Sequence, residues 1–297
     1  MASDLSIIVT SYNRAVVLRR TLMRLVAEAP EADLIVCDDG STDGTLDMLA
    51  WDFPGARVLS NTTGRPRGVV AQRHLGYLAA HGRYALSIDD DLRLGRSGTI
   101  AWLRSHFDMP GVAVVAVPFV DVLCDAKVQN ASPSTAAPAE RHAHIGAGAM
   151  IDLNAYHDVG GYGLWIEGYR EEADLALRLM DGGYRVIAPP ATFIAQHMRL
   201  PGGLSAKARH RSARNDVLFY WRYTPGWRWM PFVCATILRN LRDAMTEGAP
   251  RARLTGLAAA WPHARRMGLT RRPVRQDAFL RFRHLKSAGP VPTEVAP

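Results

Sequence analysis

The chain has few cysteines and no long apolar run, and each scarcity excludes a class of protein. Its 297 residues include three cysteines, Cys37, Cys124 and Cys234, which are widely spaced and form no C-x-x-C pair. This spacing favours a reducing compartment over a disulfide framework. No uncharged apolar stretch approaches the roughly 18 to 20 residues of a membrane-spanning helix. The first residues also lack the basic and apolar regions of a signal peptide, so we expect a cytoplasmic protein.

Acidic residues are scarce in the last third of the chain. Residues 201–297 hold 18 Lys and Arg against 5 Asp and Glu, whereas residues 1–200 hold 18 against 23. The two parts therefore carry net charges of +13 and −5, which add to the +8 of the whole chain. Such asymmetry predicts two parts, a domain at 1–200 and a basic helical region at 201–297 that packs on that domain or on a membrane surface. The basic region is expected to meet an anionic partner, such as phospholipid headgroups or a phosphorylated molecule.

Apolar runs of strand length alternate with segments of helical periodicity. This alternation is typical of an α/β fold with a mostly parallel sheet covered by helices. The Ala-, Ser- and Pro-rich segment 125–140 is predicted to be a mobile surface loop. Strands are expected at 5–10, 33–38, 57–60, 84–88, 112–120 and 144–151, an extended stretch at 185–195, and helices at 15–28, 45–51, 69–80, 99–107, 153–159 and 171–180.

Two predicted strands end in carboxylates. Asp39 follows one of them, and Asp89, Asp90 and Asp91 follow another. Because ligands collect at the carboxyl ends of strands in open α/β sheets, the two clusters are expected to share one crevice. Three adjacent acids repel one another, and a divalent cation with oxygen ligands would relieve that repulsion. Such a cation would also stabilise negative charge on a leaving diphosphate. The alternative is that the three acids form a solvated turn and bind no cation.

Seven short motifs follow one another along the first 200 residues: Ser6–Arg14, Val36–Thr45, Ala71–Gly82, Leu86–Asp91, Gly146–Ile151, Gly160–Tyr162 and Glu171–Arg178. Their order and spacing resemble family two glycosyltransferases of GT-A fold, over roughly residues 4 to 200. The resemblance implies a Rossmann-like catalytic domain at 1–200 that binds a nucleotide sugar, with a UDP- or dTDP-sugar expected. It also implies an inverting transfer of the sugar to an acceptor hydroxyl, assisted by Mn²⁺ or Mg²⁺. Cell-surface glycan, glycolipid or secondary-metabolite biosynthesis is the expected context.

The resemblance further implies where the donor binds. The end of the first strand and Asp39 would hold the nucleobase and ribose, and Arg73 would lie near the base or phosphates. Asp89 and Asp91 match the family's Asp-any-Asp element, with Asp91 the leading metal ligand and Asp89 nearer the ribose as well as a second ligand. Asp39 as a turn cap and Arg73 as a solvated helix residue are the alternatives. The substrate-binding residues expected in this part of the chain are Thr10, Ser11, Tyr12, Arg14, Asp39, Arg73, Asp89, Asp90 and Gly148.

A group of acids at 171–174 supplies the candidate base. Transfer to a hydroxyl with inversion needs a carboxylate that removes the acceptor proton. Glu171 and Glu172 resemble the family's Glu-Asp element, whose second position carries the base. Glu172 is therefore the predicted base, Asp174 is the second candidate, and Glu171 is expected to contact substrate. All three lie in the first turn of a predicted helix, so helix-end stabilisation is the alternative.

Later residues are assigned to the metal, the diphosphate and the acceptor. His197 is placed where some related enzymes supply a late histidine to the metal or diphosphate, with a surface imidazole as the alternative. Arg211 and Arg214 are expected to cover the diphosphate, unless they form a solvated face. Trp165 is expected to stack on a sugar, with core packing as the alternative. His74 stands where many relatives have Asn, and Gly163 where many have Asp, so contacts near the acceptor are expected to differ.

The C-terminal part interleaves arginines with the aromatic residues Trp221, Tyr223, Trp227, Trp229 and Phe232. This mixture suits peripheral contact with the inner face of an anionic cell membrane and a lipid-linked acceptor, although packing on the first domain would explain the same residues. Two other functions compete. A nucleotidyltransferase on a similar fold would need a Gly-rich phosphate loop, which residues 9–14 lack. A non-catalytic binder of membrane or nucleic acid would not need strand-end carboxylates, which repel phosphates, so we expect no nucleic-acid partner.

Overall fold

The computed structural model describes residues 4–124, 127–198, 202, 204–246 and 250–292. Within these residues, one large sheet contains β1 (Leu5–Ser11), β2 (Asp33–Asp38), β3 (Arg57–Ser60), β4 (Tyr84–Asp89), β6 (Val112–Ala116), β9 (Ala139–Glu140), β10 (Gly148–Asp152), β11 (Arg185–Ala188) and β13 (Val291–Pro292). Their order is β13-β9-β11-β6-β10-β4-β1-β2-β3. The pairs along β4-β1-β2-β3 and the pair of β6 with β11 are parallel, whereas β10 is antiparallel to both of its neighbours.

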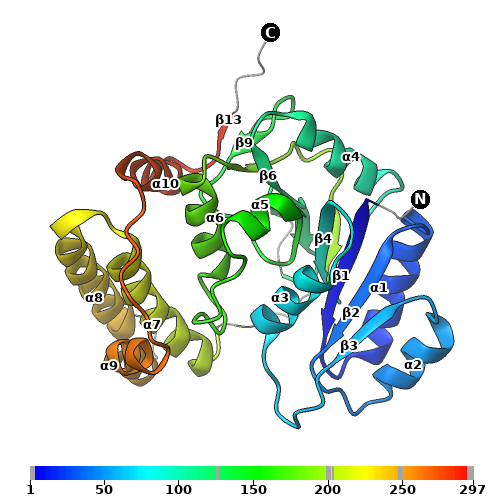
Figure 1. Cartoon of the computed structure of the whole chain (residues 1–297), viewed down its shortest axis with the longest axis horizontal. Helices are drawn as coiled ribbons and strands as arrows, with labels where there is room; N and C mark the ends of the chain where they lie inside the picture. The colour runs from blue at the N-terminus through cyan, green and yellow to red at the C-terminus, as the bar shows by residue number, and fades with distance from the viewer. Residues whose placement is uncertain (1–3, 125–126, 199–201, 203, 247–249, 293–297) are drawn as a thin grey trace.

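Helices cover both faces of this sheet (Figure 1). The first six α-helices are α1 (Ala15–Glu28), α2 (Thr45–Asp52), α3 (Val69–Ala79), α4 (Thr99–Ser105), α5 (Leu153–Asp158) and α6 (Glu171–Asp181). On one face, α1, α2 and α4 bury residues such as Leu22 and Leu103 against the strands. On the other face, α3, α5 and α6 bury residues such as Tyr77 and Leu179. The predicted α/β fold with a mostly parallel, helix-covered sheet is confirmed.

Parallel pairing aligns the ends of the central strands. β1 lies between β2 and β4, and all seven of its residues are buried because helices cover both of its sides. In the registers of these pairs, Ser11 lies beside Asp38 and Thr10 lies beside Asp89. The polar residues that end or follow these three strands therefore gather at one edge of the sheet.

A second, smaller sheet brings a distant segment to the same edge. Its strands, in spatial order, are β5 (Leu92–Arg93), β12 (Ala195–His197), β7 (Phe119–Asp121) and β8 (Val128–Gln129). His197 pairs with Leu92 on one side and with Asp121 on the other. Because Leu92 directly follows Asp91, this pairing returns His197 to the acidic triplet.

Four helices at the C-terminal end complete the molecule: α7 (Ala206–Tyr223), α8 (Trp229–Thr246), α9 (Pro250–Arg266) and α10 (Gln276–Ala288). Figure 1 shows α7, α8 and α9 grouped to one side of the sheet, beyond α6. Apolar residues of these helices meet α6 in a third buried cluster, which includes Leu177, Phe219 and Phe282. The basic part of the chain therefore shares a core with the last helix of the first part.

Packing within the protein explains the positions of most of the aromatic residues that suit membrane contact. Tyr223 is buried in the third cluster, and Trp221, Trp229 and Phe232 are partly buried against it. Trp227 differs, because 70% of its surface is exposed. None of the helices in the described part of the chain is both apolar enough and long enough to cross a bilayer.

The structure differs from the sequence-based prediction in four segments. In the extended stretch expected at 185–195, only β11 and the first residue of β12 are strand. The single strand expected at 112–120 is two strands, β6 and β7, in different sheets, with Pro118 between them. The strand expected at 144–151 begins at Gly148. The segment 125–140 is not wholly a loop, because it contains β8, which pairs with β7, and β9, which pairs with β11; residues 125 and 126 lie outside the described residues. These short strands carry no periodicity that a sequence could reveal.

The close packing of α3 on β1 depends on Gly76. A Cβ at this position would lie 2.4 Å from Cγ2 of Ile8 and 2.9 Å from Sγ of Cys37. We expect Gly76→Ala to lower the free energy of unfolding by about 1 to 3 kcal/mol, measured by urea denaturation, because the added methyl overpacks a core. Gly55→Ala is the matched control, since a Cβ there would have no heavy atom within 4 Å. Equal stabilities of the two variants would contradict this account of the packing.

Candidate active site

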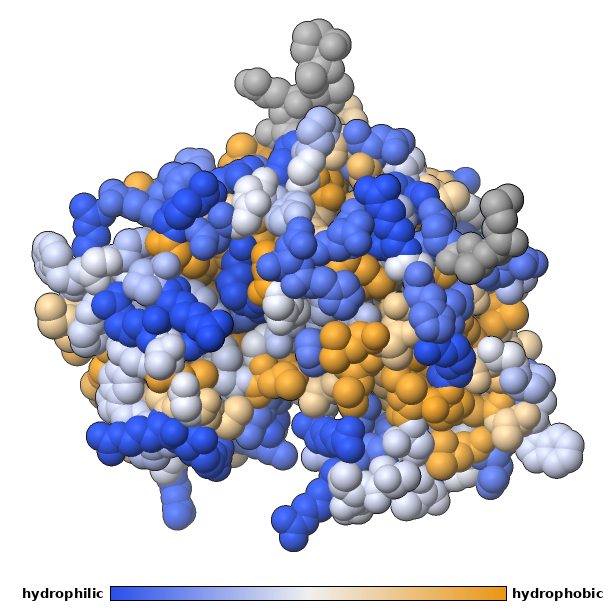
Figure 2. Space-filling view, viewed as in Figure 1, coloured by the Kyte–Doolittle hydropathy of each residue, from blue (hydrophilic) through white to orange (hydrophobic). Residues whose placement is uncertain are grey.

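A cleft of about 1080 Å³ opens at the carboxyl ends of β1, β2 and β4. Its other wall is formed by the start of α6 and by residues of α7, α8 and α9. In the space-filling view, an indentation at the lower edge separates the C-terminal helices from the lobe that contains the central sheet (Figure 2). The predicted residues that line this cleft are Thr10, Ser11, Tyr12, Arg14, Asp39, Arg73, Asp89, Asp90, Asp91, Glu171, Glu172, His197 and Arg211.

Each of the three acids at the end of β4 pairs with a basic residue, and Asp90 and Asp91 share Arg14. Asp89 forms an ion pair with Arg73 at 2.7 Å. Asp90 accepts a hydrogen bond from Ser11 at 2.7 Å and pairs with Arg14 at 2.8 Å. Burial nevertheless raises the pKa of Asp90 to about 6. Asp90 therefore ties the acidic turn, residues 89–91, to β1.

Asp91 is held between Arg14 and His197. Its two carboxylate oxygens lie 2.8 Å from the Arg14 guanidinium and 3.1 Å from Nε2 of His197. Burial alone would raise the pKa of Asp91, but hydrogen bonds from His197 and Arg14 outweigh burial and lower this pKa to about 2. Burial likewise opposes the positive charge of His197, whereas Asp91 and Asp121 together raise its pKa. The site thus stabilises positive charge at Nε2 of His197.

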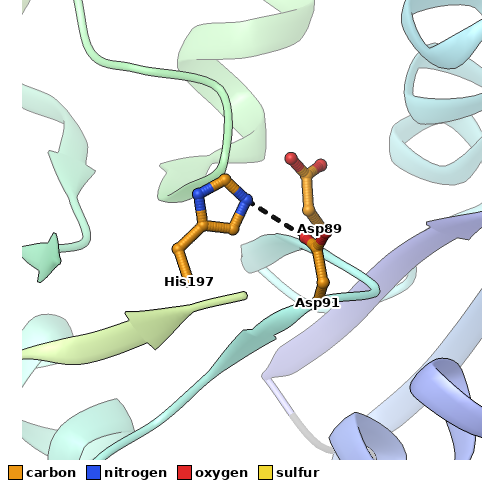
Figure 3. Close-up of side chains that lie close together, drawn as sticks. All are labelled: Asp89, Asp91 and His197. Atoms are coloured by element: carbon orange, nitrogen blue, oxygen red, sulfur yellow. Dashed lines mark ion pairs between the residues drawn. The ribbon is translucent and has the colours of Figure 1, made fainter. Parts of the chain in front are cut away.

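Asp89, Asp91 and His197 form a group that fits a divalent metal ion. One ligand atom of each lies within 4.8 Å of the others, and Figure 3 shows the three side chains converging from β4, the acidic turn and β12. Nδ1 of His197 lies 2.5 Å from Asp121, so Nε2 is left to face Asp91. A carboxylate on the far nitrogen is the usual way in which a metal-binding histidine is oriented. Carboxylate oxygens with one imidazole suit Mn²⁺, and Mg²⁺ accepts the oxygens.

Asp39 shapes the cleft wall through the chain itself. One of its oxygens accepts hydrogen bonds from Asn61, the Arg67 backbone and Gln72, and the other accepts one from the Gly68 backbone, all at 2.8 or 2.9 Å. Burial opposes ionisation of Asp39, but these bonds lower its pKa. A carboxylate offers about four acceptor sites, so the second oxygen retains capacity for a ligand.

Glu172 and Arg73 meet at the centre of the cleft beside Gly146. A Cβ on Gly146 would lie 2.3 Å from Oε1 of Glu172 and 2.9 Å from a terminal nitrogen of Arg73. The absence of a side chain at this position therefore makes room for both groups. Burial and the neighbouring Glu171 carboxyl raise the pKa of Glu172, and Arg73 offsets them only in part. A raised pKa suits a carboxylate that must accept a proton near neutral pH.

Four predicted site residues do not line the cleft, which corrects their placement. Asp174 is fully buried and accepts hydrogen bonds from Tyr223 at 2.5 Å and Arg178 at 3.0 Å, so it links α6 to α7. Trp165 packs in the third cluster, which agrees with the core packing that was the alternative to sugar stacking. The remaining two are Gly148, where a Cβ would lie 2.7 Å from Leu92, and Arg214, which pairs with Glu167 at 3.3 Å.

Several residues that line the cleft were missed from the sequence. Gln72 lies inside a recognised motif, and Tyr169 and Arg170 directly precede another. Their positions in the sequence could therefore have indicated them. His144 likewise lies two residues before the motif Gly146–Ile151, and burial lowers its pKa to about 3, so it is neutral. The residues from α7, α8 and α9 reach the cleft only through tertiary packing. The missed residues with polar or charged side chains include Gln72, His144, Glu167, Tyr169, Arg170, Ser212, Asp216, Arg239, Asp243 and Arg253.

The family model for glycosyl transferase family 2 matches residues 6–162 of the chain. The chain belongs to glycosyl transferase family 2. It is therefore a glycosyltransferase, and the predicted family and enzyme class are confirmed. The family match ends before Glu172 and His197, so those residues are placed by the structure and not by the match. No curated protein matches the chain.

Solved glycosyltransferases share the fold at low sequence identity. The mannosyltransferase PcManGT from Pyrobaculum calidifontis, solved with GDP-Man and Mn²⁺, has a TM-score of 0.58 and 19% identity over 97% of this chain and 81% of its own. GalNAc-T7, solved with UDP, GalNAc and Mn²⁺, has a TM-score of 0.64 and 13% identity over 96% of this chain and 57% of its own. TarS from S. aureus has a TM-score of 0.56 and 15% identity over 80% of this chain and 43% of its own. The predicted GT-A architecture is thereby confirmed.

The metal site predicts a loss of cation binding when its histidine is removed. We expect His197→Ala to weaken Mn²⁺ binding, measured by electron paramagnetic resonance titration with UDP or GDP present, by about 10- to 100-fold. Asp121→Asn should weaken binding in the same direction, because Asp121 orients the imidazole. His284→Ala on the exposed side of α10 is the control and should leave Mn²⁺ binding unchanged. Unaltered affinity in His197→Ala would remove this residue from the ligand set.

Proposed function

We propose that the glycosyltransferase moves a sugar from a nucleoside-diphosphate sugar to an acceptor hydroxyl with inversion, assisted by Mn²⁺ or Mg²⁺. One observation carries the proposal: Asp89, Asp91 and His197 lie in the same cleft as a partly buried glutamate, Glu172, with a raised pKa. The first group fits a metal that binds a diphosphate, and the second fits a base for an acceptor. GDP-Man, UDP and Mn²⁺ in the solved structures of similar fold support the donor class.

The donor would lie along the ends of β1, β2 and β4. Tyr12 is 46% exposed and lines the cleft, so its ring is available to a nucleobase, and the free acceptor capacity of Asp39 is available to base or ribose. Arg14 and Arg73 supply positive charge on either side of the acidic turn. A metal ion held by Asp89, Asp91 and His197 would supply electrostatic stabilisation of the departing diphosphate.

Glu172 would act on the acceptor. Its carboxylate removes the proton from the acceptor hydroxyl as the oxygen forms a bond to the anomeric carbon. The bond between that carbon and the diphosphate breaks on the opposite face, and its electron pair leaves with the nucleotide. One carboxylate suffices for this step, so the buried Asp174 is not needed as a base. Glu171, which is buried beside Glu172, raises the proton affinity of the base.

The acceptor side would be built by the C-terminal helices. Residues of α7, α8 and α9 line the cleft opposite the acidic turn, including Arg211, Arg239 and Arg253. We therefore assign 1–200 to donor binding and catalysis and 201–297 to a basic region that completes the acceptor wall. A lipid-linked acceptor, peripheral membrane contact and a cytoplasmic location remain predictions from the sequence. Among the aromatic residues of the C-terminal part that were named for lipid contact, Trp227 is the most exposed.

A donor screen tests the proposed function. We expect one class among UDP-, GDP- and dTDP-sugars to raise the melting temperature when Mn²⁺ is present, because a ligand that binds the folded state stabilises it. The Asp91→Asn variant is the control and should lose this Mn²⁺-dependent increase. Slow release of nucleoside diphosphate from the same donor would confirm the bond that breaks. Release of pyrophosphate from a nucleoside triphosphate instead would establish the competing nucleotidyltransferase.

Glu172→Gln should remove most turnover and leave donor binding intact, because the amide cannot accept the acceptor proton. In the native enzyme, the base works only when ionised, so kcat/KM should fall as the pH drops through its raised pKa. That acidic limb is expected above the ordinary glutamate value of about 4.3, and Glu172→Gln should lack it. Steady-state kinetics across pH provide the measurement. Near-normal turnover of Glu172→Gln would refute the assignment of the base.

A further inference from the structure

The turn that carries Glu172 has an uncommon backbone. Gly168, Tyr169 and Arg170 have φ values of +127°, +66° and +88°, and they directly precede α6. Two of the three are not glycine, and side chains disfavour positive φ. Such a conformation persists only when the surrounding structure holds it in place. The position of the predicted base therefore depends on whatever holds residues 168–170.

Asn215 of α7 makes the contacts that hold this turn. It is fully buried, and its Nδ2 donates hydrogen bonds to the carbonyl oxygens of Gly168 and Tyr169, both at 2.9 Å. Its Oδ1 accepts a hydrogen bond from Nε of Arg214 at 3.0 Å. Two carbonyls and a guanidinium can be satisfied by only one orientation of an amide, so Arg214 fixes which end of Asn215 faces the turn.

Asp216, the next residue of α7, binds Arg170, the last residue of the same turn. Asp216 accepts a hydrogen bond from Nε of Arg170 at 2.5 Å and forms an ion pair with Arg239 of α8 at 2.7 Å. Arg170 is the N-cap residue directly before α6 and has a left-handed conformation. Asn215 and Asp216 of α7 thus bind consecutive residues of the turn. Arg239 of α8 in turn pairs with Asp216.

We propose that Asn215 is a positioning residue for the transfer reaction: it holds the left-handed turn at 168–170 and so sets Glu172 against the acceptor. Asn215 does not line the cleft, so it acts through the backbone and not by touching substrate. This inference rests on the proposed role of Glu172. It also gives Arg214 a function that the sequence did not suggest, because Arg214 orients the amide and does not cover a diphosphate.

Asn215→Ala tests the proposal through a separation of turnover from donor binding. A displacement of a reacting group by about 1 Å can cost on the order of 10²-fold in rate, so kcat should fall by about that factor. The dissociation constant of UDP or GDP with Mn²⁺ should change by less than about threefold, because the donor side is built on β1, β4 and β12. The matched control is Thr99→Ala, which removes another buried polar side chain, on α4, that donates a hydrogen bond to the carbonyl oxygen of Arg96 instead of to the turn.

A double-mutant cycle with Tyr169→Gly distinguishes positioning from general support of the fold. Glycine adopts positive φ readily, so the turn needs less help when residue 169 is glycine. We expect Asn215→Ala to lower kcat several-fold less in the Tyr169→Gly background than in the native one. Additive effects on kcat, or parallel losses of kcat and nucleotide affinity in Asn215→Ala, would overturn the proposal, as would an unchanged kcat.

Two further variants keep the test decisive. If Asn215→Ala does not fold, Asn215→Ser and Arg214→Gln weaken the same hydrogen bonds more mildly, and both should lower kcat while retaining nucleotide binding. Retention of full kcat by both would overturn the role of Asn215. Failure of the proposed function has a separate signature, since Glu172→Gln would then keep its turnover whatever Asn215→Ala does.

Discussion

The site depends on the balance of charge around three consecutive carboxylates. Asp89, Asp90 and Asp91 are tolerated at the end of a buried strand because Arg73, Arg14 and His197 each neutralise part of their charge. The compensating residues come from α3, from the segment after β1 and from β12, which are far apart in the sequence. The central sheet and the second sheet must therefore both form before the acidic turn is stable. A divalent cation would replace some of this compensation and would itself bind a diphosphate.

Much of the donor side could be predicted from the sequence because it depends on local pattern. The alternation of apolar runs and helical periodicity located the strands from 5 to 89 to within a residue, and parallel strands place their carboxyl ends together. The acceptor side could not be predicted in this way. Asp174, on α6, and Trp165, in the turn segment before α6, have the residue types of a site but face a core, and only tertiary packing decides which way such side chains point.

The cleft is built from residues on both sides of position 162, where the family match ends. The family match covers residues 6–162, which include β1, β2 and β4 with the acidic turn, whereas Glu172 and His197 lie beyond it. His197 returns to the donor side because β12 pairs with β5, directly after the acidic turn. Glu172 is instead fixed by contacts of its turn with α7. Two separate tertiary connections therefore complete one cleft from the part of the chain that the match does not reach.

The third hydrophobic cluster gives the two sides of the cleft a degree of mechanical independence. The donor side rests on the two cores that flank the sheet, whereas α7 rests on a core shared by α6 and the C-terminal helices. Repacking of that third core would act first on the turn before α6, because α6 contacts the sheet through the second core, which includes Leu179. A change of acceptor could thus arise from substitutions buried well outside the cleft, while the nucleotide remains bound in the same way.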